Sequence, residues 1–135
     1  MSVWTAATLV TDADLTAQES RMPDQAQRVV ADSGGTAYDG KRGLVKADLT
    51  SWIKRRGLSA AGVLDPTEFN RAATFLELSY IYRDMAQRND VVASGKSDFY
   101  HARYVEEIEG LDFDYEAPTA TATTHVRPLA YLWRS

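Results

Sequence analysis

The chain has 135 residues, a length that suits one domain with a modest hydrophobic core. It has no cysteine, which excludes disulfides and thiolate metal sites, and no apolar run approaches the roughly 20 residues that span a bilayer. The net charge of −4 argues against a dedicated nucleic-acid binder, and the N-terminus lacks a secretory pattern, so we expect a soluble, cytosolic protein without membrane contact.

The first third of the chain predicts short elements. Met1 to Val10 is β-branched, apolar and uncharged, which predicts a short strand or an extended arm. Thr11 to Asp14 is close to a capping box and predicts a short helix to about Ser20, with Leu15 as its apolar anchor. The glycine-rich segment Ser33 to Gly43 predicts a mobile loop.

A helix is expected from Leu44 to Arg56, followed by a linker over Leu58 to Leu64. Gly57 stands where a left-handed cap residue is usual, just after three cations that suit a helix C-terminus. One face carries the apolar residues at helical spacing, namely Val45, Leu49, Trp52 and Ile53.

The strongest helix signal begins at Asp65. Asp65 can cap, Pro66 suits the first helical position, and Glu68 is placed to reach back, so we expect a helix to about Asn89. Two apolar stripes follow it, one of Phe69, Ala72, Ala73, Leu76 and Tyr80 and one of Phe75, Leu78, Tyr82 and Met85. A helix that is apolar on two sides lies between partners rather than on a surface.

A last helix is expected from Ser97 or Asp98 to about Gly110, after a connection over Val91 to Lys96. Tyrosines follow helical spacing on this helix and the one before it, at Tyr80, Tyr82, Tyr100 and Tyr104. Two long helices packed against each other explain this pattern more simply than a cofactor site does.

The segment Asp112 to Ser135 ends in large apolar residues that follow an alternating Thr/Ala run, Thr119 to Thr124. These residues are Leu129, Tyr131, Leu132 and Trp133, and burial stabilises each by roughly 1.5–3 kcal/mol. Such a tail either folds back or docks on a neighbouring molecule. We expect the helices before it to suffice for a core, so we interpret Thr119 to Thr124 as a spacer and Val126 to Trp133 as a docking segment.

The sequence does not match the known motifs for catalysis or cofactor binding in full. Gly35 to Lys41 has the glycine and lysine spacing of a phosphate-binding loop, but Arg42 stands where that loop has Ser or Thr. His101 and His125 are far apart, and no nucleophile elbow is present. We therefore expect no enzyme activity, no cofactor and no metal; nucleotide titration tests the loop.

A band of cations lies within an otherwise acidic chain. Its members are Lys41, Arg42, Lys46, Lys54, Arg55 and Arg56. The last three can simply complement a helix C-terminus, or the whole band can face phosphates without sequence preference. Leu49 to Leu76 mimics a helix–turn–helix, but the connection Gly57 to Leu64 is too long for that motif. The alternative function is thus a small helical DNA-binding or regulatory protein that uses residues 41–56.

Three segments resemble the head–tail connector (adaptor, or head-completion) proteins of tailed bacteriophages. Leu9 to Leu15 resembles their extended lead into a capped first helix, Phe69 to Met85 their long central helix, and Phe99 to Leu111 their closing helix. The resemblance implies a structural protein of the virion neck, made in the host cytoplasm. It implies a ring, commonly of twelve copies, that joins the portal to a tail-side neck or tail terminator protein while DNA passes through its channel.

The sequence therefore predicts a mainly α fold, a bundle of about four helices with extended N- and C-terminal arms. Residues 1–111 are expected to form the helical domain with an extended lead, and residues 112–135 the docking arm. The expected contacts with the portal or a neighbouring copy are Val126, Leu129, Tyr131, Leu132 and Trp133, and the band of cations is the candidate channel or DNA-facing surface. Deleting residues 112–135 is expected to preserve the fold and abolish attachment.

Overall fold

A computed structural model describes residues 4–19, 39–87, 91–116 and 124–126 of the chain. Helix accounts for 77% of these residues, which confirms the expected mainly α fold with about four helices. The elements are α1 (Ala6–Leu9), α2 (Asp12–Gln18), α4 (Asp39–Arg55), α5 (Asn70–Ala86), α6 (Val91–Glu109) and the strands β1 (Phe113–Tyr115) and β2 (Thr124–Val126).

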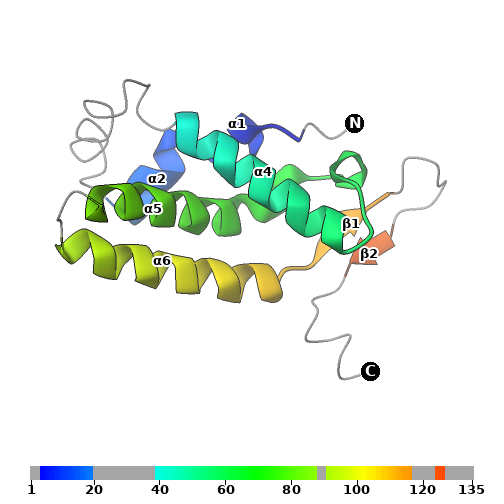
Figure 1. The fold of residues 1–135 in the computed structure, drawn as a ribbon. Helices are drawn as coiled ribbons and strands as arrows, with labels where there is room; N and C mark the ends of the chain where they lie inside the picture. The colour runs from blue at the N-terminus through cyan, green and yellow to red at the C-terminus, as the bar shows by residue number, and fades with distance from the viewer. Residues whose placement is uncertain (1–3, 20–38, 88–90, 117–123, 127–135) are drawn as a thin grey trace.

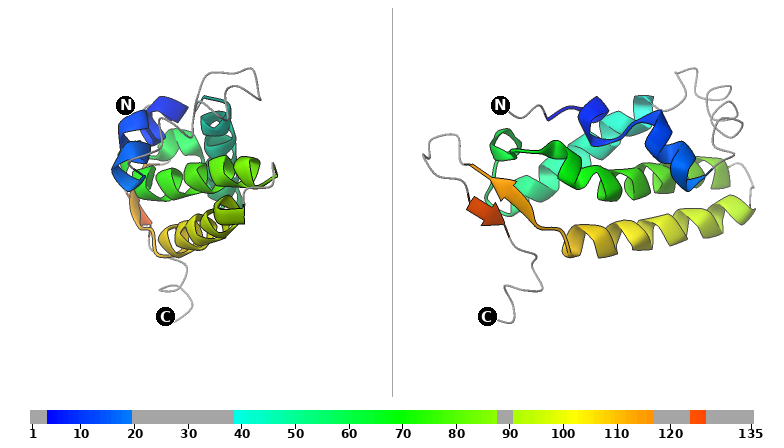
Figure 2. Two further views of the ribbon diagram at one scale, coloured as in Figure 1. Left: turned by 90° about the vertical axis from the view of Figure 1, so that its left-hand side faces the viewer. Right: turned by 180° about the vertical axis from the view of Figure 1, so that it is seen from behind.

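Helix α5 lies at the centre of the bundle (Figure 1). Helices α4 and α6 flank it on two sides, and α1 and α2 cover the face turned away from the viewer of Figure 1, as the two views of Figure 2 show. Helices α4 and α6 run in the same direction and α5 runs against both. The two strands lie at the end of the bundle where α4 and α6 finish.

The N-terminal segment is helical where a strand or an extended arm was expected. That prediction is wrong for Ala6–Leu9, because Thr5 and Thr8 form a capping box that begins α1. Leu9 and Val10 are fully buried and attach the segment to the core. The capping box predicted at Thr11 is confirmed, since its hydroxyl accepts from the Asp14 amide at the start of α2.

Helix α4 begins at Asp39, so the loop predicted over Ser33 to Gly43 is wrong for residues 39–43. Contacts with α5 explain the earlier start, because Lys41 and Arg42 reach acidic side chains there. The predicted apolar face is confirmed, since Val45, Leu49, Trp52 and Ile53 are buried. Gly57 has φ +76°, which confirms the left-handed cap residue.

The predicted central helix consists of a 3₁₀ turn, Pro66–Phe69, followed by α5. Asp65 caps the turn by accepting from the Thr67 amide at 3.1 Å. Both predicted stripes of α5 are largely buried. The partners are helices of the same chain, since α5 packs against α6 on one side and against α4, α1 and α2 on others. A ring neighbour is therefore not needed to explain a helix that is apolar on two sides.

Helix α6 begins at Val91, so the connection predicted over Val91 to Lys96 is wrong. Ala93 is buried against the bundle and Lys96 binds Glu19 of the N-terminal segment, and these contacts hold the first turns of α6 in place. The predicted packing of two long helices is confirmed by the stacked rings of Tyr82 and Tyr100, whose centroids lie 5.9 Å apart.

Strand β1 belongs to the core, so the arm boundary predicted at Asp112 lies too early. Phe113 is fully buried, and its ring centroid lies 4.9 Å from that of Phe69. Tyr115 is also buried, and its hydroxyl accepts from the Ser59 amide at 3.1 Å. The linker after α4 supplies backbone partners for β1, because the Leu64 amide donates to the carbonyl of Asp114 at 3.2 Å. The Glu116 amide, just after β1, donates to the carbonyl of Gly62 at 2.8 Å.

Candidate interaction surfaces

The C-terminal site predicted from the sequence is described only at its first residue. Val126 is the last residue of β2 and pairs with Phe113 of β1 in an antiparallel register. Leu129, Tyr131, Leu132 and Trp133 lie outside the described residues, as does most of the Thr/Ala run. The chain thus enters residues 127–135 from a strand that is hydrogen-bonded to a core strand.

Two of the six predicted surface cations have structural roles. Arg42 faces Glu77, with 3.5 Å between Nε and Oε1, and the Glu77 side chain is fully buried. Lys41 lies 3.8 Å from a carboxylate oxygen of Asp84. Both contacts join the first turn of α4 to α5, so these two cations neutralise charges of their own subunit rather than form an outward band.

The other four cations lie along and just after α4. The Arg56 guanidinium lies 4.7 Å from the ring centroid of Trp52, and burial lowers the pKa of Arg56. Lys46, Lys54 and Arg55 are exposed. The structure therefore keeps three cations of the predicted band on the outer surface of α4, which is a small electrostatic footprint for a DNA-binding protein.

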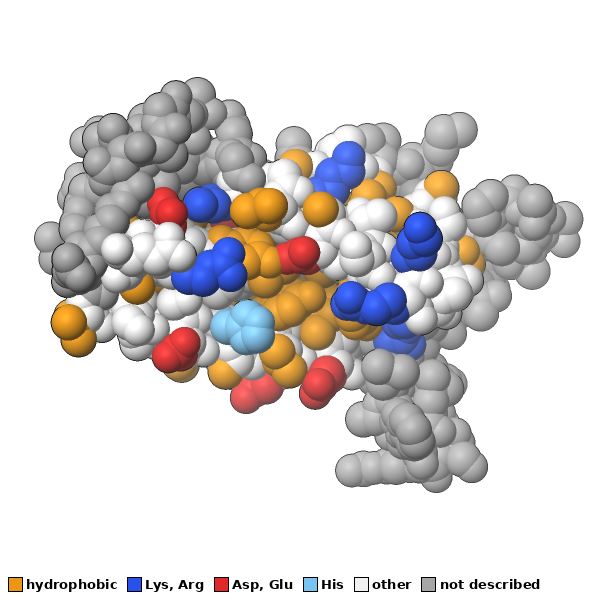
Figure 3. Space-filling model, viewed as in Figure 1, with side chains coloured by type: hydrophobic (Ala, Val, Ile, Leu, Met, Phe, Trp, Pro, Cys, Tyr) orange, Lys and Arg blue, Asp and Glu red, His pale blue; other side chains and the backbone are white. Residues whose placement is uncertain are grey.

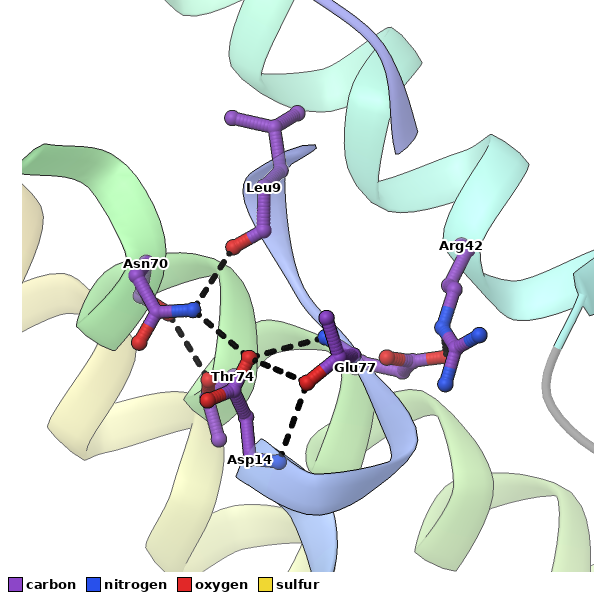
Figure 4. Close-up of polar contacts among 7 residues, drawn as sticks. Leu9, Asp14, Arg42, Asn70, Thr74 and Glu77 are labelled. Carbon is purple, nitrogen blue, oxygen red and sulfur yellow. Dashed lines mark hydrogen bonds and ion pairs between the residues drawn. The ribbon is translucent and has the colours of Figure 1, made fainter. Parts of the chain in front are cut away.

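A partly buried polar cluster joins α1 and α2 to α5 (Figure 4). The Asn70 amide nitrogen donates to the carbonyl oxygen of Leu9 at 3.0 Å and to Oδ2 of Asp14 at 2.8 Å. Burial raises the pKa of Asp14, but hydrogen bonds from Asn70 and Thr11 outweigh it, so the pKa is lowered overall. The sequence analysis did not predict this cluster. Figure 4 shows Glu77 beside it, and this glutamate between two leucines of α5 was a sequence signal for polar contacts inside the bundle.

A second polar cluster joins the end of α2 to α6. The Glu19 carboxylate accepts from Lys96 Nζ at 3.1 Å and from the Tyr100 hydroxyl at 2.6 Å. Burial raises the pKa of Glu19, but these hydrogen bonds outweigh it, so the pKa is lowered overall. Burial and the hydrogen bond to Glu19 raise the pKa of Tyr100 far above its usual range, so this hydroxyl stays protonated and acts as a donor. Both clusters position the N-terminal segment and suit a structural role.

The N-terminal half of the outer face of α6 is apolar, which the sequence did not indicate for residues 91–96 because a connection was expected there. Val91 and Val92 are 85% and 70% exposed, and Phe99 is 58% exposed. On α4, Leu44 is 47% exposed. A contiguous patch of large apolar side chains is a usual mark of a protein interface, and Val92 and Phe99 lie two turns apart on one face of α6.

One histidine and most acidic side chains near the end of α6 and on β1 lie on the surface, whereas Glu107 is partly buried and pairs with Arg71. His101 is exposed on α6, beside the ring of Tyr104. Asp112 and Asp114 are exposed, as are Glu106 and Glu109. Within the described ranges, no group of three His, Cys, Asp or Glu residues could hold a metal ion, and no helix has the length and apolar character needed to cross a membrane.

No family model, curated protein or solved structure matches this chain.

Proposed function

We propose that this chain is a structural subunit of a phage neck, a head–tail connector that joins the portal to the tail side and leaves a channel for DNA. The observation that carries the proposal is the order of core and apolar residues along the chain. The buried core extends to Phe113 and Tyr115 of β1. Four further large apolar residues follow β2 in the sequence, between positions 129 and 133. The likeness of three segments to phage connectors supplies the identity of the partner.

The hairpin of β1 and β2 supports this role mechanically. Phe113 anchors β1 in the core, and β2 is held to β1 through the pairs Phe113–Val126 and Tyr115–Thr124. Strand β2 lies at the end of the bundle (Figure 1), so the proposed arm would start there from a fixed point. Force applied to the arm would act on β1, which is anchored in the core, rather than on a helix end. This arrangement suits a connection that transmits force between two rings.

Residues 127–135 are thus the proposed docking arm, which is shorter than the arm predicted from the sequence. Leu129, Tyr131, Leu132 and Trp133 would fill a groove of the portal or add a strand to it, as extended segments do in many complexes. Val126 would set the position from which the arm starts. In this proposal the protein has no catalytic activity, and any contact with the passing DNA is non-specific.

Co-sedimentation with particles of the portal protein encoded in the same genome tests this function. The full chain should pellet with the particles, and a chain that lacks Arg127 to Ser135 should remain in the supernatant while keeping its helical circular dichroism. Trp133→Ala should weaken binding, whereas the matched control Arg134→Ala should bind as the full chain does. Equal binding by the truncated and full chains would refute the arm, and no binding by the full chain would refute the connector function.

A further inference from the structure

Helix α6 has an outer face that is apolar at one end and acidic at the other. Exposed residues recur on it at alternating intervals of three and four, the spacing by which helices pack side by side. In chain order these are Val92, Gly95, Phe99, Ala102, Glu106 and Glu109. Val91 and Asp98 flank them and are also exposed. The face thus changes from apolar to acidic toward the C-terminus of α6.

Helix α4 has an outer face with the same spacing and the opposite charge. Its exposed residues are Leu44, Ala47, Ser51 and Lys54, and Arg55 flanks the last of them. Over its whole length α4 has five Lys or Arg and two Asp, whereas α6 has two Lys or Arg and four Asp or Glu. In Figure 3, blue side chains gather toward the C-terminal end of α4, and red ones follow the edge formed by α6.

The two faces belong to helices that lie on different sides of α5 and run in the same direction. Helices α4 and α6 lie on different sides of α5 and both run toward the strand end of the bundle (Figures 1 and 2). A neighbouring copy in a similar orientation could therefore place its α6 parallel to α4. Leu44 and Ala47 would then meet the half of α6 that contains Phe99, and Lys54 and Arg55 would meet Glu106 and Glu109.

We propose that α4 of one copy packs in parallel along α6 of the next copy and that this contact builds the ring. It deepens the proposed connector function and rests on it, because it names the surfaces through which ring neighbours touch. The contact is heterologous, since it joins two different faces, and a repeated heterologous contact closes into a ring when its rotation allows. Lys54 and Arg55 are thereby assigned to a neighbouring copy rather than to DNA.

Two features of the faces favour a second copy over DNA. Exposed Leu44 shares the outer face of α4 with Lys54, about three turns further along the helix, and an apolar side chain gains little against a phosphate backbone. Glu106 pairs with Arg103 of the same helix at 3.4 Å and Glu107 with Arg71 of α5, but the C-terminal half of α6 still has more acidic than basic residues. Helix α4 offers the opposite charge on a helix of similar length. The two faces are therefore complementary, since each has an apolar half and their other halves have opposite charge.

Cysteine crosslinking tests the contact, because the chain has no cysteine of its own. Ser51→Cys on α4 and Ala102→Cys on α6 place thiols at exposed positions of the two faces. With a short bis-maleimide, the chain that contains both changes should give a ladder of dimers, trimers and larger species. Each single variant should stay uncrosslinked, and a mixture of the two single variants should stop at dimers.

The crosslinking is done with the purified full chain at high concentration and again with portal particles present. Absence of the ladder in both conditions would overturn the inference, as would dimers from Ala102→Cys alone, which indicate a symmetric contact between two copies of α6. A ladder without portal binding would refute the connector function and leave the contact standing. Portal binding without a ladder would refute the contact and leave the function standing.

Charge exchange separates this contact from DNA binding. Lys54→Glu with Arg55→Glu should weaken self-association by at least about tenfold, and Glu106→Lys with Glu109→Lys should do the same. A mixture of the two altered chains should assemble again, because each then offers the charge that the other needs. Failure of the mixture to assemble, together with loss of duplex DNA binding in the first variant alone, would assign these cations to DNA instead.

Discussion

Phe113→Ala is the sharpest test of the conclusion that β1 belongs to the core rather than to the arm. The Phe113 side chain is fully buried and packs against Phe69 and Trp52, with ring centroids 4.9 Å and 6.1 Å away. Truncation of a buried phenylalanine to alanine costs about 3–5 kcal/mol, since both the transfer energy and the cavity count. That is a large share of the roughly 5–15 kcal/mol that stabilises a domain.

The assay is thermal and urea unfolding followed by circular dichroism. For a chain of this size the loss corresponds to a fall in Tm of about 10–20 °C. Phe99→Ala is the matched control, because the same residue type is 58% exposed on α6 and its removal should cost no more than about 0.5 kcal/mol. Equal effects of the two substitutions would refute the placement of β1 in the core and restore the arm boundary at Asp112.

Three further predictions concern the buried contacts. Glu19→Gln should lower the free energy of unfolding by about 1–2 kcal/mol at pH 7, measured by urea unfolding. The pKa of Glu19 is lowered from its usual 4.5, so its contribution to stability is present above that pH and is lost as the pH falls below it. The stabilities of the original chain and the variant should therefore converge in acid. Gly62→Ala should cost about 1–3 kcal/mol in urea unfolding, because its Cβ would overlap the tyrosine ring of β1, whereas Gly43→Ala, which meets open space in α4, should be neutral or stabilising; equal effects would argue against the close approach. Arg42→Met should lower the free energy of unfolding by about 3–5 kcal/mol, because it removes the cation that faces the buried Glu77 carboxylate. Adding Glu77→Leu should recover part of that loss, and an Arg42→Met chain of unchanged stability would refute the ion pair.

Local signals predicted the parts of the fold that local contacts determine. The capping residues Thr11 and Asp65 begin helical turns at the predicted places, and Gly57 ends a helix in the predicted conformation. Each of these depends on hydrogen bonds or backbone angles within a few residues, so the short sequence pattern contains the needed information.

The helix starts at Asp39 and Val91 were missed for the opposite reason. Glycines near both starts favour loops, but side chains in the first turns of these helices bind partners far away in the sequence. Arg42 contacts Glu77, 35 positions on, and Lys96 contacts Glu19, 77 positions back. Only the folded chain brings those charges together, so the sequence pattern could not indicate that the helices begin earlier.

For the candidate sites too, the sequence predicted what depends on local position and missed what depends on contacts with distant segments. The exposure of Lys46, Lys54 and Arg55 followed from their positions on α4, whereas the pairing of Lys41 and Arg42 with α5 did not. The short strand β1 was read as the beginning of the tail because its three residues show no helical spacing. Its partners, the Leu64 amide and the Ser59 amide, lie in a segment that the sequence presented as a simple linker.

Electron microscopy of portal particles incubated with the full chain tests the connector proposal most directly. The proposal predicts a closed ring of copies on the portal, coaxial with its channel, with residues 127–135 seated on the portal and α4 of each copy beside α6 of the next. Portal particles that stay bare at saturating protein, or that bind scattered single copies through another surface, would contradict it.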